Sequence, residues 1–240
     1  MRIDRRSFLG LSVLSAAAAG SLPAFGQGAA PLKIGIIGSG RIGGTIGGLW
    51  VKAGHQVLFS SRHPEELKGL VDGLGPLARA GQVAEAATFG DVIFIAVPYA
   101  AFPQIGKDYA SLLAGKVMLD ASNAVERRDG GDITNEVKEA GIGVTSSKYF
   151  PGAKIVRAFN TMGYTVFQNN AHRPGDKLAI PIAGDEQAAL DTASRLIRDA
   201  GFEPVVIGPL TRASLFQQGG PLYGVQTTAA DLRKRASELK

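Results

Sequence analysis

Short apolar runs alternate along the chain with longer segments in which apolar positions recur at helical spacing. Patterns of buried strands occupy residues 32–37, 56–60, 91–97, 116–120, 154–159, 177–183 and 204–207. Helical patterns occupy residues 42–53, 64–71, 83–89, 100–113, 132–140 and 186–200. Asp185 is the expected cap of the last helix, and Gly201 its end. Strands that alternate with helices in this way predict an α/β fold with a doubly wound, mostly parallel sheet.

A glycine motif follows the first predicted strand and opens the first predicted helix. It reads GSGRIG and consists of Gly38, Ser39, Gly40, Arg41, Ile42 and Gly43. Gly38 makes the turn, Gly40 lets the backbone approach a pyrophosphate, and Gly43 allows the helix to pack closely on the strand. The pattern alone is weak in a chain with 32 glycines. In its strand–turn–helix context it predicts a Rossmann fold with a dinucleotide on the helix N-terminus.

The end of the second predicted strand indicates which dinucleotide binds. NAD-dependent chains place an acid about 20 residues beyond the motif, where it binds the ribose hydroxyls. Here the sequence is Ser60-Ser61-Arg62-His63, with no acid before Glu65. Hydroxyl and guanidinium groups suit a 2′-phosphate, because Arg offers paired donors and a full charge. We therefore expect NADP(H) to be held by Ser60, Ser61 and Arg62, with a solvated loop arginine as the alternative.

Three further strand ends are expected to meet the cofactor at the same edge of the sheet. The segment Val97-Pro98-Tyr99 ends the strand at 91–97, the segment from Asp120 to Asn123 ends the next, and Asn160 follows the strand at 154–159. The backbone around Pro98 is expected to line the nicotinamide-ribose site. Asp120 is either a loop cap or a ligand. Asn160 either meets the carboxamide or starts a turn.

Several kinds of chemistry have no support in the sequence. The chain has no cysteine, which excludes disulfides, thiolate metal sites and a cysteine nucleophile. Its three histidines lie far apart, no spacing suggests a metal site, and no nucleophile elbow is present. No Lys or His at a predicted strand end is a convincing general acid, and Lys148 and Lys154 fit a solvated surface. Hydride transfer to a flavin-like ring mainly needs two flat rings in contact, so it tolerates this absence.

The N-terminal residues 1–26 have the pattern of an export signal. Arg5-Arg6-Ser7-Phe8-Leu9 precedes a short Ala-rich apolar run and small residues up to Gly26, after which we expect cleavage. The paired arginines predict the twin-arginine export machinery as a partner and a periplasmic location, with an ordinary secretory signal as the alternative. The run is shorter than the ~20 residues of a membrane span. Because this route carries folded proteins, we expect the cofactor to be loaded before export.

The charge balance gives little reason to expect nucleic acid. The formal net charge is +5, from 26 Lys and Arg against 21 Asp and Glu. Removal of residues 1–26 takes away three arginines and one aspartate, which leaves +3. The remaining basic residues are scattered, which is not typical of a nucleic-acid site.

The chain resembles the NADPH-dependent F-420 reductase (F-420:NADP oxidoreductase) family. The matching segments are IGIIGSGRIGGTIG, HQVLFSSR, DVIFIAVPYAA, VMLDASNAV, KIVRAFNT, PIAGDEQAAL and VVIGPLTRASL, within residues 32–216. The nucleotide-binding domain of the metazoan ferric reductases of the STEAP type is similar too. The resemblance implies hydride transfer between NADPH and a deazaflavin without an acid–base residue, and a dimer that covers the cleft. It also implies cofactor contacts by Gly38, Ser39, Gly40, Arg41, Ile42, Ser61, Arg62, Val97 and Pro98.

The expected organisation has three parts: the signal at 1–26, an NAD(P)-binding Rossmann domain at 32–210, and a short helical tail at 211–240. The tail is broken at Gly219-Gly220-Pro221 and is expected to complete the cleft or a dimer contact. The tail and the export signal depart from the F-420 reductase pattern. They leave room for a flavin, a quinone, or ferric iron reduced by way of flavin as the acceptor.

The leading hypothesis is an NADP-dependent oxidoreductase that acts on a flat small-molecule acceptor, F-420 or a flavin. A non-catalytic NADP-binding or redox-sensing protein is the alternative from another class. An imine or hydroxy-acid reductase ranks lower, because those families carry a large helical C-terminal domain and only about 30 residues follow the last predicted strand here.

Overall fold

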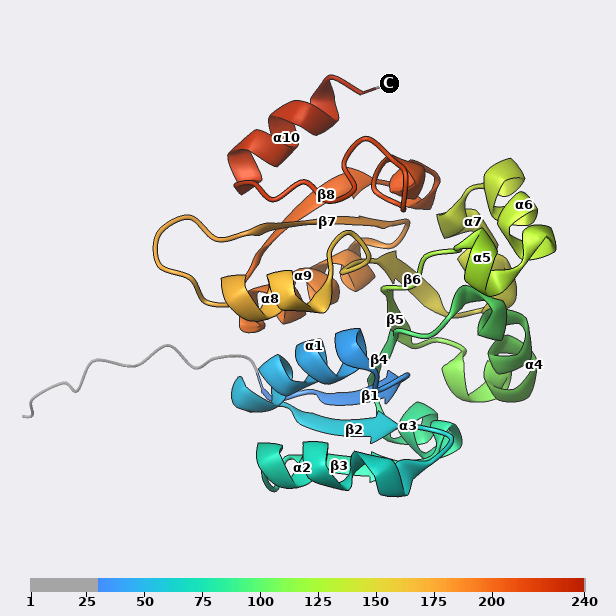
Figure 1. The fold of residues 1–240 in the computed structure, drawn as a ribbon, viewed down its shortest axis with the longest axis vertical. Helices are drawn as coiled ribbons and strands as arrows, with labels where there is room; N and C mark the ends of the chain where they lie inside the picture. Colours follow the sequence, from blue (N-terminus) through green and yellow to red (C-terminus); the bar gives the residue numbers. More distant parts are fainter. Residues whose placement is uncertain (1–29, 240) are drawn as a thin grey trace, which may run out of the picture. The chain divides into compact units, whose positions relative to one another are not determined.

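An eight-stranded sheet runs through residues 30–239, the part of the chain that this computed structural model describes (Figure 1). The strands are β1 (Lys33–Ile37), β2 (Gln56–Ser60), β3 (Ala78–Gly81), β4 (Val92–Ile95), β5 (Val117–Asp120), β6 (Lys154–Arg157), β7 (Ala179–Gly184) and β8 (Glu203–Gly208). Their order in the sheet is β3-β2-β1-β4-β5-β6-β7-β8. All neighbouring strands are parallel except β6 and β7. The predicted doubly wound, mostly parallel α/β sheet is confirmed.

Helices cover both faces of the sheet. They are α1 (Arg41–Lys52), α2 (Lys68–Leu74), α3 (Val83–Phe89), α4 (Phe102–Leu113), α5 (Glu126–Asp129), α6 (Gly131–Ala140), α7 (Ile142–Tyr149), α8 (Tyr164–Asn170), α9 (Gln187–Asp199) and α10 (Ala229–Ser237). Three short 3-10 helices are η1 (Pro64–Leu67), η2 (Tyr99–Ala101) and η3 (Leu210–Leu215). None of these described helices is long and apolar enough to cross a membrane.

The core is divided by the sheet into two layers. Successive residues of a strand point to opposite faces, so Ile36 packs with α1, α8 and α9 while its neighbour Ile37 packs with α4, α6 and α7. β1 and β4 are apolar on both faces, as expected for strands at the middle of a covered parallel sheet. This arrangement places the carboxyl ends of β1, β4, β5 and β6 side by side at one edge.

Some elements differ from the prediction. Strand β3 and helices α5, α7 and α8 were not expected, and the helix predicted at 64–71 begins as η1 and continues as α2. β3 reads ARAG and lies at the edge of the sheet with its middle residues exposed, so it has no apolar run to reveal it. Only Gly141, with φ of 85°, separates α6 from α7. The four unexpected elements have eight residues or fewer, which is too short for a clear strand or helix pattern of apolar residues in the sequence.

The prediction that Asp185 caps α9 is wrong. Glu186 occupies the N-cap position and makes no side-chain hydrogen bond to the helix. Asp185 instead accepts a hydrogen bond from the backbone N–H of Leu210, at 2.8 Å, and so ties the end of β7 to η3. The export signal predicted at 1–26 lies outside the described residues.

Candidate functional site

The glycine motif forms the turn between β1 and α1. Gly38 has a φ of 96°, and a Cβ there would lie 2.5 Å from Cγ1 of Val97. A Cβ on Gly43 would lie 2.0 Å from the carbonyl oxygen of Gly38. Gly38 is therefore required by its positive φ and by the close approach of Val97, and Gly43 by the packing of α1 on the turn. Gly40 differs, because a Cβ there would meet nothing within 4 Å. The backbone at Gly40 borders open space, as a phosphate cradle requires.

The first turn of α1 and the preceding Ser39 offer polar groups for which the described part of the chain provides no partner. Gly40 is the N-cap, it provides no side-chain cap, and the first turn carries no acid. The N–H groups at a helix start lack partners within the helix and attract anions. Ser39 donates its N–H to the carbonyl oxygen of Ser60 at 3.2 Å, while its buried Oγ has no partner. A free hydroxyl beside a helix N-terminus fits a pyrophosphate oxygen.

The three residues at the end of β2 that were predicted to hold the 2′-phosphate differ in the accessibility of their side chains. Ser60 is fully buried and donates its hydroxyl to the carbonyl oxygen of Ile36 at 2.7 Å, so its side chain holds two strands together. Ser61 accepts the N–H of His63 with its Oγ at 3.0 Å. Arg62 is exposed and makes no ion pair or hydrogen bond with another described residue. Ser61 and Arg62 are accessible to a ligand, whereas the Ser60 side chain is not.

A cleft of about 390 Å³ opens where β4, β5 and β6 end. Six of the residues predicted to bind the cofactor line it: Arg41, Ile42, Val97, Pro98, Asn123 and Asn160. Parallel strands that fan out at a switch in sheet order leave a crevice at this position. The lining residues that sequence reasoning missed are Ala96, Ala121, Ser122, Val125, Arg128, Phe159, Met162, Gly163, Tyr164, Gln218 and Tyr223.

Tyr99 lies apart from the other predicted residues. Its side chain is fully buried and stacks on the ring of Phe102, with 4.3 Å between ring centroids. Its Oη lies 2.9 Å from Oγ of Ser146 and 3.2 Å from the carbonyl oxygen of Ile142. Burial raises the pKa of the Tyr99 hydroxyl. The side chain joins η2 to α7 and does not line the cleft.

A buried ion pair supports the floor of the cleft. Asp120 at the end of β5 pairs with Arg157 at the end of β6, and neither side chain is exposed. Asp120 also accepts the N–H of Ser122 at 2.8 Å and the hydroxyl of Ser146 at 2.7 Å. Arg157 donates to the carbonyl oxygen of Ser122 at 2.5 Å. Of the two roles considered for Asp120, the structure supports the loop cap. Arg157 was missed, because one arginine in an apolar strand gives no signal of its partner.

Phe159 sets the direction in which the chain leaves β6. Its φ of 60° is unusual for a bulky residue. The ring packs edge-on against four other aromatic rings at centroid distances of 5.6–6.0 Å. This packing holds the strained backbone and directs the next residue, Asn160, into the cleft lining.

The amide side chains of Asn123 and Asn160 join β5, β6 and the tail. Asn123 donates to the carbonyl oxygen of Asn160 at 2.7 Å, and its Oδ1 accepts the N–H of Gln218 at 3.2 Å. Asn160 donates to the carbonyl oxygen of Phe216 at 2.9 Å. Its Oδ1 is buried and has no partner. An oriented, unpartnered acceptor at the inner end of the cleft fits the carboxamide N–H of a nicotinamide.

The ionisable side chains in the cleft lining are two arginines and two tyrosines: Arg41, Arg128, Tyr164 and Tyr223. Arg41 lies over the ring of Tyr164, 5.2 Å from its centroid. Arg128 donates to Asp129, whose buried carboxylate also accepts the N–H groups of Ala100 and Val125. Burial alone raises the pKa of Asp129, but these hydrogen bonds outweigh burial and hold the pKa below its usual range. The cleft is therefore basic, which suits an anionic cofactor.

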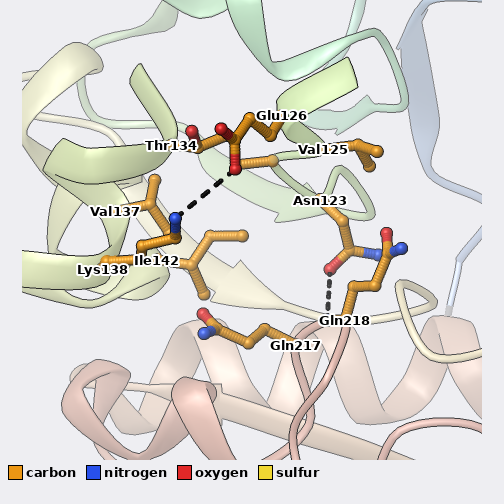
Figure 2. Close-up of a pocket in the computed structure, with 10 residues that line it drawn as sticks. Asn123, Val125, Glu126, Thr134, Val137, Lys138, Ile142, Gln217 and Gln218 are labelled. Carbon is orange, nitrogen blue, oxygen red and sulfur yellow. Dashed lines mark hydrogen bonds and ion pairs between the residues drawn. The ribbon is translucent and has the colours of Figure 1, made fainter. Parts of the chain in front are cut away.

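A second cavity of about 250 Å³ adjoins the cleft (Figure 2). It shares Asn123, Val125 and Gln218 with the cleft lining. Its other lining residues are Ala124, Glu126, Thr134, Val137, Lys138, Ile142 and Gln217. Helices α5, α6 and α7 supply one side and the turn after η3 supplies the other. Within residues 30–239 no group of three or more His, Cys, Asp or Glu residues could hold a metal ion.

The turn at Gly38–Gly43, the guanidinium after β2 and the cleft at the strand ends are features of the Rossmann class of nucleotide-binding folds. Residues 33–124 match a family model described as NADP oxidoreductase, coenzyme F420-dependent. That segment contains the glycine motif, Arg62 and the ends of β4 and β5. It ends before β6 and the tail, which supply Asn160 and Gln218.

Related proteins extend this similarity over most of the chain. Metalloreductase STEAP3 of Rattus norvegicus is 30% identical over 187 residues, which are 75% of this chain and 35% of that protein. The chain thus matches about a third of the length of this curated relative. A solved structure of a hypothetical protein from Sinorhizobium meliloti is 26% identical with a TM-score of 0.70, over 83% of this chain and 96% of that one.

A further solved structure supports the fold. A proposed F420-dependent NADP reductase of Arthrobacter sp. FB24 is 24% identical with a TM-score of 0.66, over 76% of this chain and 87% of that one. This similarity supports the Rossmann fold, and the family model that matches residues 33–124 is described as that of an NADP oxidoreductase.

Proposed function

We propose that the protein transfers hydride between NADP(H) and a flat, flavin-like acceptor, either the deazaflavin F-420 or a flavin. The observation that carries this proposal is the cleft at the strand ends. Its lining combines Asn160 Oδ1, an unpartnered acceptor, with an absence of Lys, His, Asp and Glu among the described lining residues. Such a site holds rings in contact without supplying a strong acid or base.

The cofactor half of the proposal rests on the ends of β1 and β2. Ser39 Oγ and the N–H groups of α1 would hold the pyrophosphate, and Ser61 and Arg62 would hold the 2′-phosphate. The free guanidinium of Arg62 supplies paired donors that match a phosphate monoester. The basic cleft adds long-range attraction for the same anion.

The chemical step that follows from this arrangement is simple. When bound, NADPH would supply a hydride from its nicotinamide ring, which the acceptor would take up together with one proton from solvent. Asn160 Oδ1 would orient the nicotinamide by accepting from its carboxamide, while Val97 and Pro98 would form the backbone floor under the ring. The residues of this chain would thus bind and orient the two rings and exclude water. Such a catalyst obtains most of its rate enhancement from this positioning.

The experiment that tests the proposal is direct. Purified protein is mixed with NADPH and, in turn, with F-420, FMN, riboflavin and menadione, and the near-ultraviolet absorbance of NADPH is followed. Oxidation that depends on enzyme and on a ring acceptor is expected. Tight binding of NADPH with no oxidation by any acceptor would instead indicate a non-catalytic NADP-binding or redox-sensing protein.

We also propose that the chain leaves the cytoplasm by the twin-arginine route and carries its cofactor with it. The support is the sequence at residues 1–26 and the fact that this route transports folded proteins. Cell fractionation of the full chain tests this, with Arg5→Lys/Arg6→Lys as the comparison. Retention of the double variant in the cytoplasm is expected, and equal export of both chains would contradict the proposal. A homodimer is proposed from family resemblance, and sedimentation tests it.

A further inference from the structure

The cavity beside the cleft differs from the cleft in chemical character. Val125, Val137 and Ile142 give it apolar walls, and the amide of Gln217 lies among them. Figure 2 shows the Gln217 side chain extending from the tail into the cavity, on the side of Ile142. Its two charged lining residues, Lys138 and Glu126, are 3.5 Å apart, 64% and 69% exposed, and opposite in sign. The interior therefore suits an uncharged ligand.

Gln217 presents a buried hydrogen-bond acceptor with no partner among residues 30–239. Its Oε1 is inaccessible to solvent and receives no hydrogen bond. A buried polar atom in this state is costly unless a ligand or water completes it. Three other buried oxygens of the described residues are also unpartnered: Ser39 Oγ, Asn160 Oδ1 and Thr161 Oγ1. Of the four residues, only Gln217 lines the second cavity.

The backbone around Gln217 is fixed. Its N–H donates to the carbonyl oxygen of Ala213 at 3.1 Å, and its own carbonyl oxygen accepts from Gly220 at 2.8 Å. The next residue, Gln218, donates its N–H to Asn123 Oδ1, and Figure 2 marks this bond between the tail and the loop after β5. Gln217 is thus held against the strand ends, which lowers the entropic cost of binding through its side chain.

The size of the cavity limits what it takes. At about 250 Å³ it lies just below the usual ~300–1,000 Å³ of small-molecule sites, so it suits one end of a ring system. It lies next to the cleft, with which it shares the lining residues Asn123, Val125 and Gln218. A ring system that is too long for the cavity would therefore extend past these residues toward the cleft.

We infer that this cavity receives one edge of the electron acceptor, and that the edge carries a ring N–H flanked by carbonyl groups, as in the pyrimidinedione end of a flavin-type ring. Gln217 Oε1 accepts that N–H, the apolar walls contact the ring faces, and the reacting part of the ring remains in the cleft. The inference rests on the proposed function and adds the residue that selects the acceptor. It favours cyclic imides over quinones, which have no ring N–H to donate.

The test uses two ligands that differ in that single group. The full chain with saturating NADP⁺ is titrated with riboflavin and with 3-methylriboflavin, in which a methyl group replaces the ring N–H, and flavin fluorescence is measured. Riboflavin is expected to bind about tenfold more tightly or better, because the methylated ring leaves the buried acceptor unpaired. Gln217→Leu is expected to bring the ratio of the two dissociation constants close to one while NADPH affinity is retained. Gln104→Leu, on the exposed side of α4, is the matched control and keeps the ratio of the unaltered protein.

The outcomes separate this inference from the proposed function. Equal binding of the two ligands by the unaltered protein overturns the inference, whether or not Gln217→Leu folds. So does a preference for riboflavin that survives in Gln217→Leu, or an absence of riboflavin binding while menadione oxidises NADPH. In these cases hydride transfer from NADPH still stands. Failure of every acceptor to oxidise NADPH removes the proposed function and this inference together.

Discussion

Asp120 and Arg157 form an ion pair beneath the cleft, in which both side chains are fully buried. The pair joins the ends of β5 and β6 and, through Ser122, the loop that carries Asn123. Two charges removed from water are tolerated only when their pairing and hydrogen bonds offset the loss of hydration. Here Ser122 and Ser146 add those bonds, so the pair fixes the distance between two strand ends that border the cleft.

The substitution Arg157→Met should destabilise the fold strongly. It leaves the Asp120 carboxylate buried without its counter-charge, which typically costs about 3–5 kcal/mol. Urea denaturation followed by circular dichroism measures the change. The double variant Asp120→Asn/Arg157→Met should recover part of the loss, because neither charge then remains. A loss below about 1 kcal/mol in the single variant would contradict the structural role of the pair.

Two glycines of the same turn should respond differently to alanine. Gly43→Ala places a Cβ 2.0 Å from a backbone oxygen, so thermal melting is expected to show clear destabilisation. Gly40→Ala meets no atom within 4 Å and should fold with about 1 kcal/mol of loss or less, since alanine is a poorer N-cap. Its methyl group projects toward the expected pyrophosphate, and NADPH titration should show weaker binding. Normal NADPH affinity in a folded Gly40→Ala would argue against this placement.

Arg62→Ala should reduce affinity for NADPH far more than for NADH. Loss of a charge-assisted contact to the 2′-phosphate corresponds to about 1.5–3 kcal/mol, or roughly 10–150-fold in the dissociation constant. Isothermal titration of the unaltered protein and the variant gives, for NADPH and for NADH, the ratio of their dissociation constants. Arg233→Ala on exposed α10 removes the same charge away from β2 and serves as control. Equal losses for the two cofactors would refute the phosphate role of Arg62.

Acid should weaken the fold in part through Asp129. Its pKa in the folded protein is held below the unfolded value of about 3.9 by Arg128 and two backbone N–H groups. The ionised carboxylate therefore adds stability that is fully present above that value and is lost as pH falls toward the folded-state pKa. Stability from urea melts at about pH 6 and about pH 3 should fall more in the unaltered chain than in Asp129→Asn. Parallel curves for the two chains would exclude this contribution.

The regular parts of the fold were accessible from the sequence because each depends on neighbouring residues. A run such as VIFI at β4 is apolar on both faces of a covered sheet, and the GSGRIG motif opens α1 just after a strand, so local pattern and position coincide. In the edge strand β3 and the helices α5, α7 and α8, no such local pattern marks the element. Their residues acquire structure from contacts with distant segments.

The candidate site shows the same difference between residues that local sequence reveals and residues that long-range contacts bring together. The sequence by itself located the residues expected at the phosphate end, since the turn at Gly38–Gly43 and Ser61-Arg62 lie within a single β1–α1–β2 unit. Only the tertiary structure decided that Ser60 and Tyr99 turn their side chains into the core and that Asp120 caps a loop against Arg157. It also brought Gln217 and Gln218 of the tail against Asn123, some 95 residues earlier in the chain. The physical reason is that hydrogen bonds and burial between strand ends depend on distances in space, which spacing along a single chain does not encode.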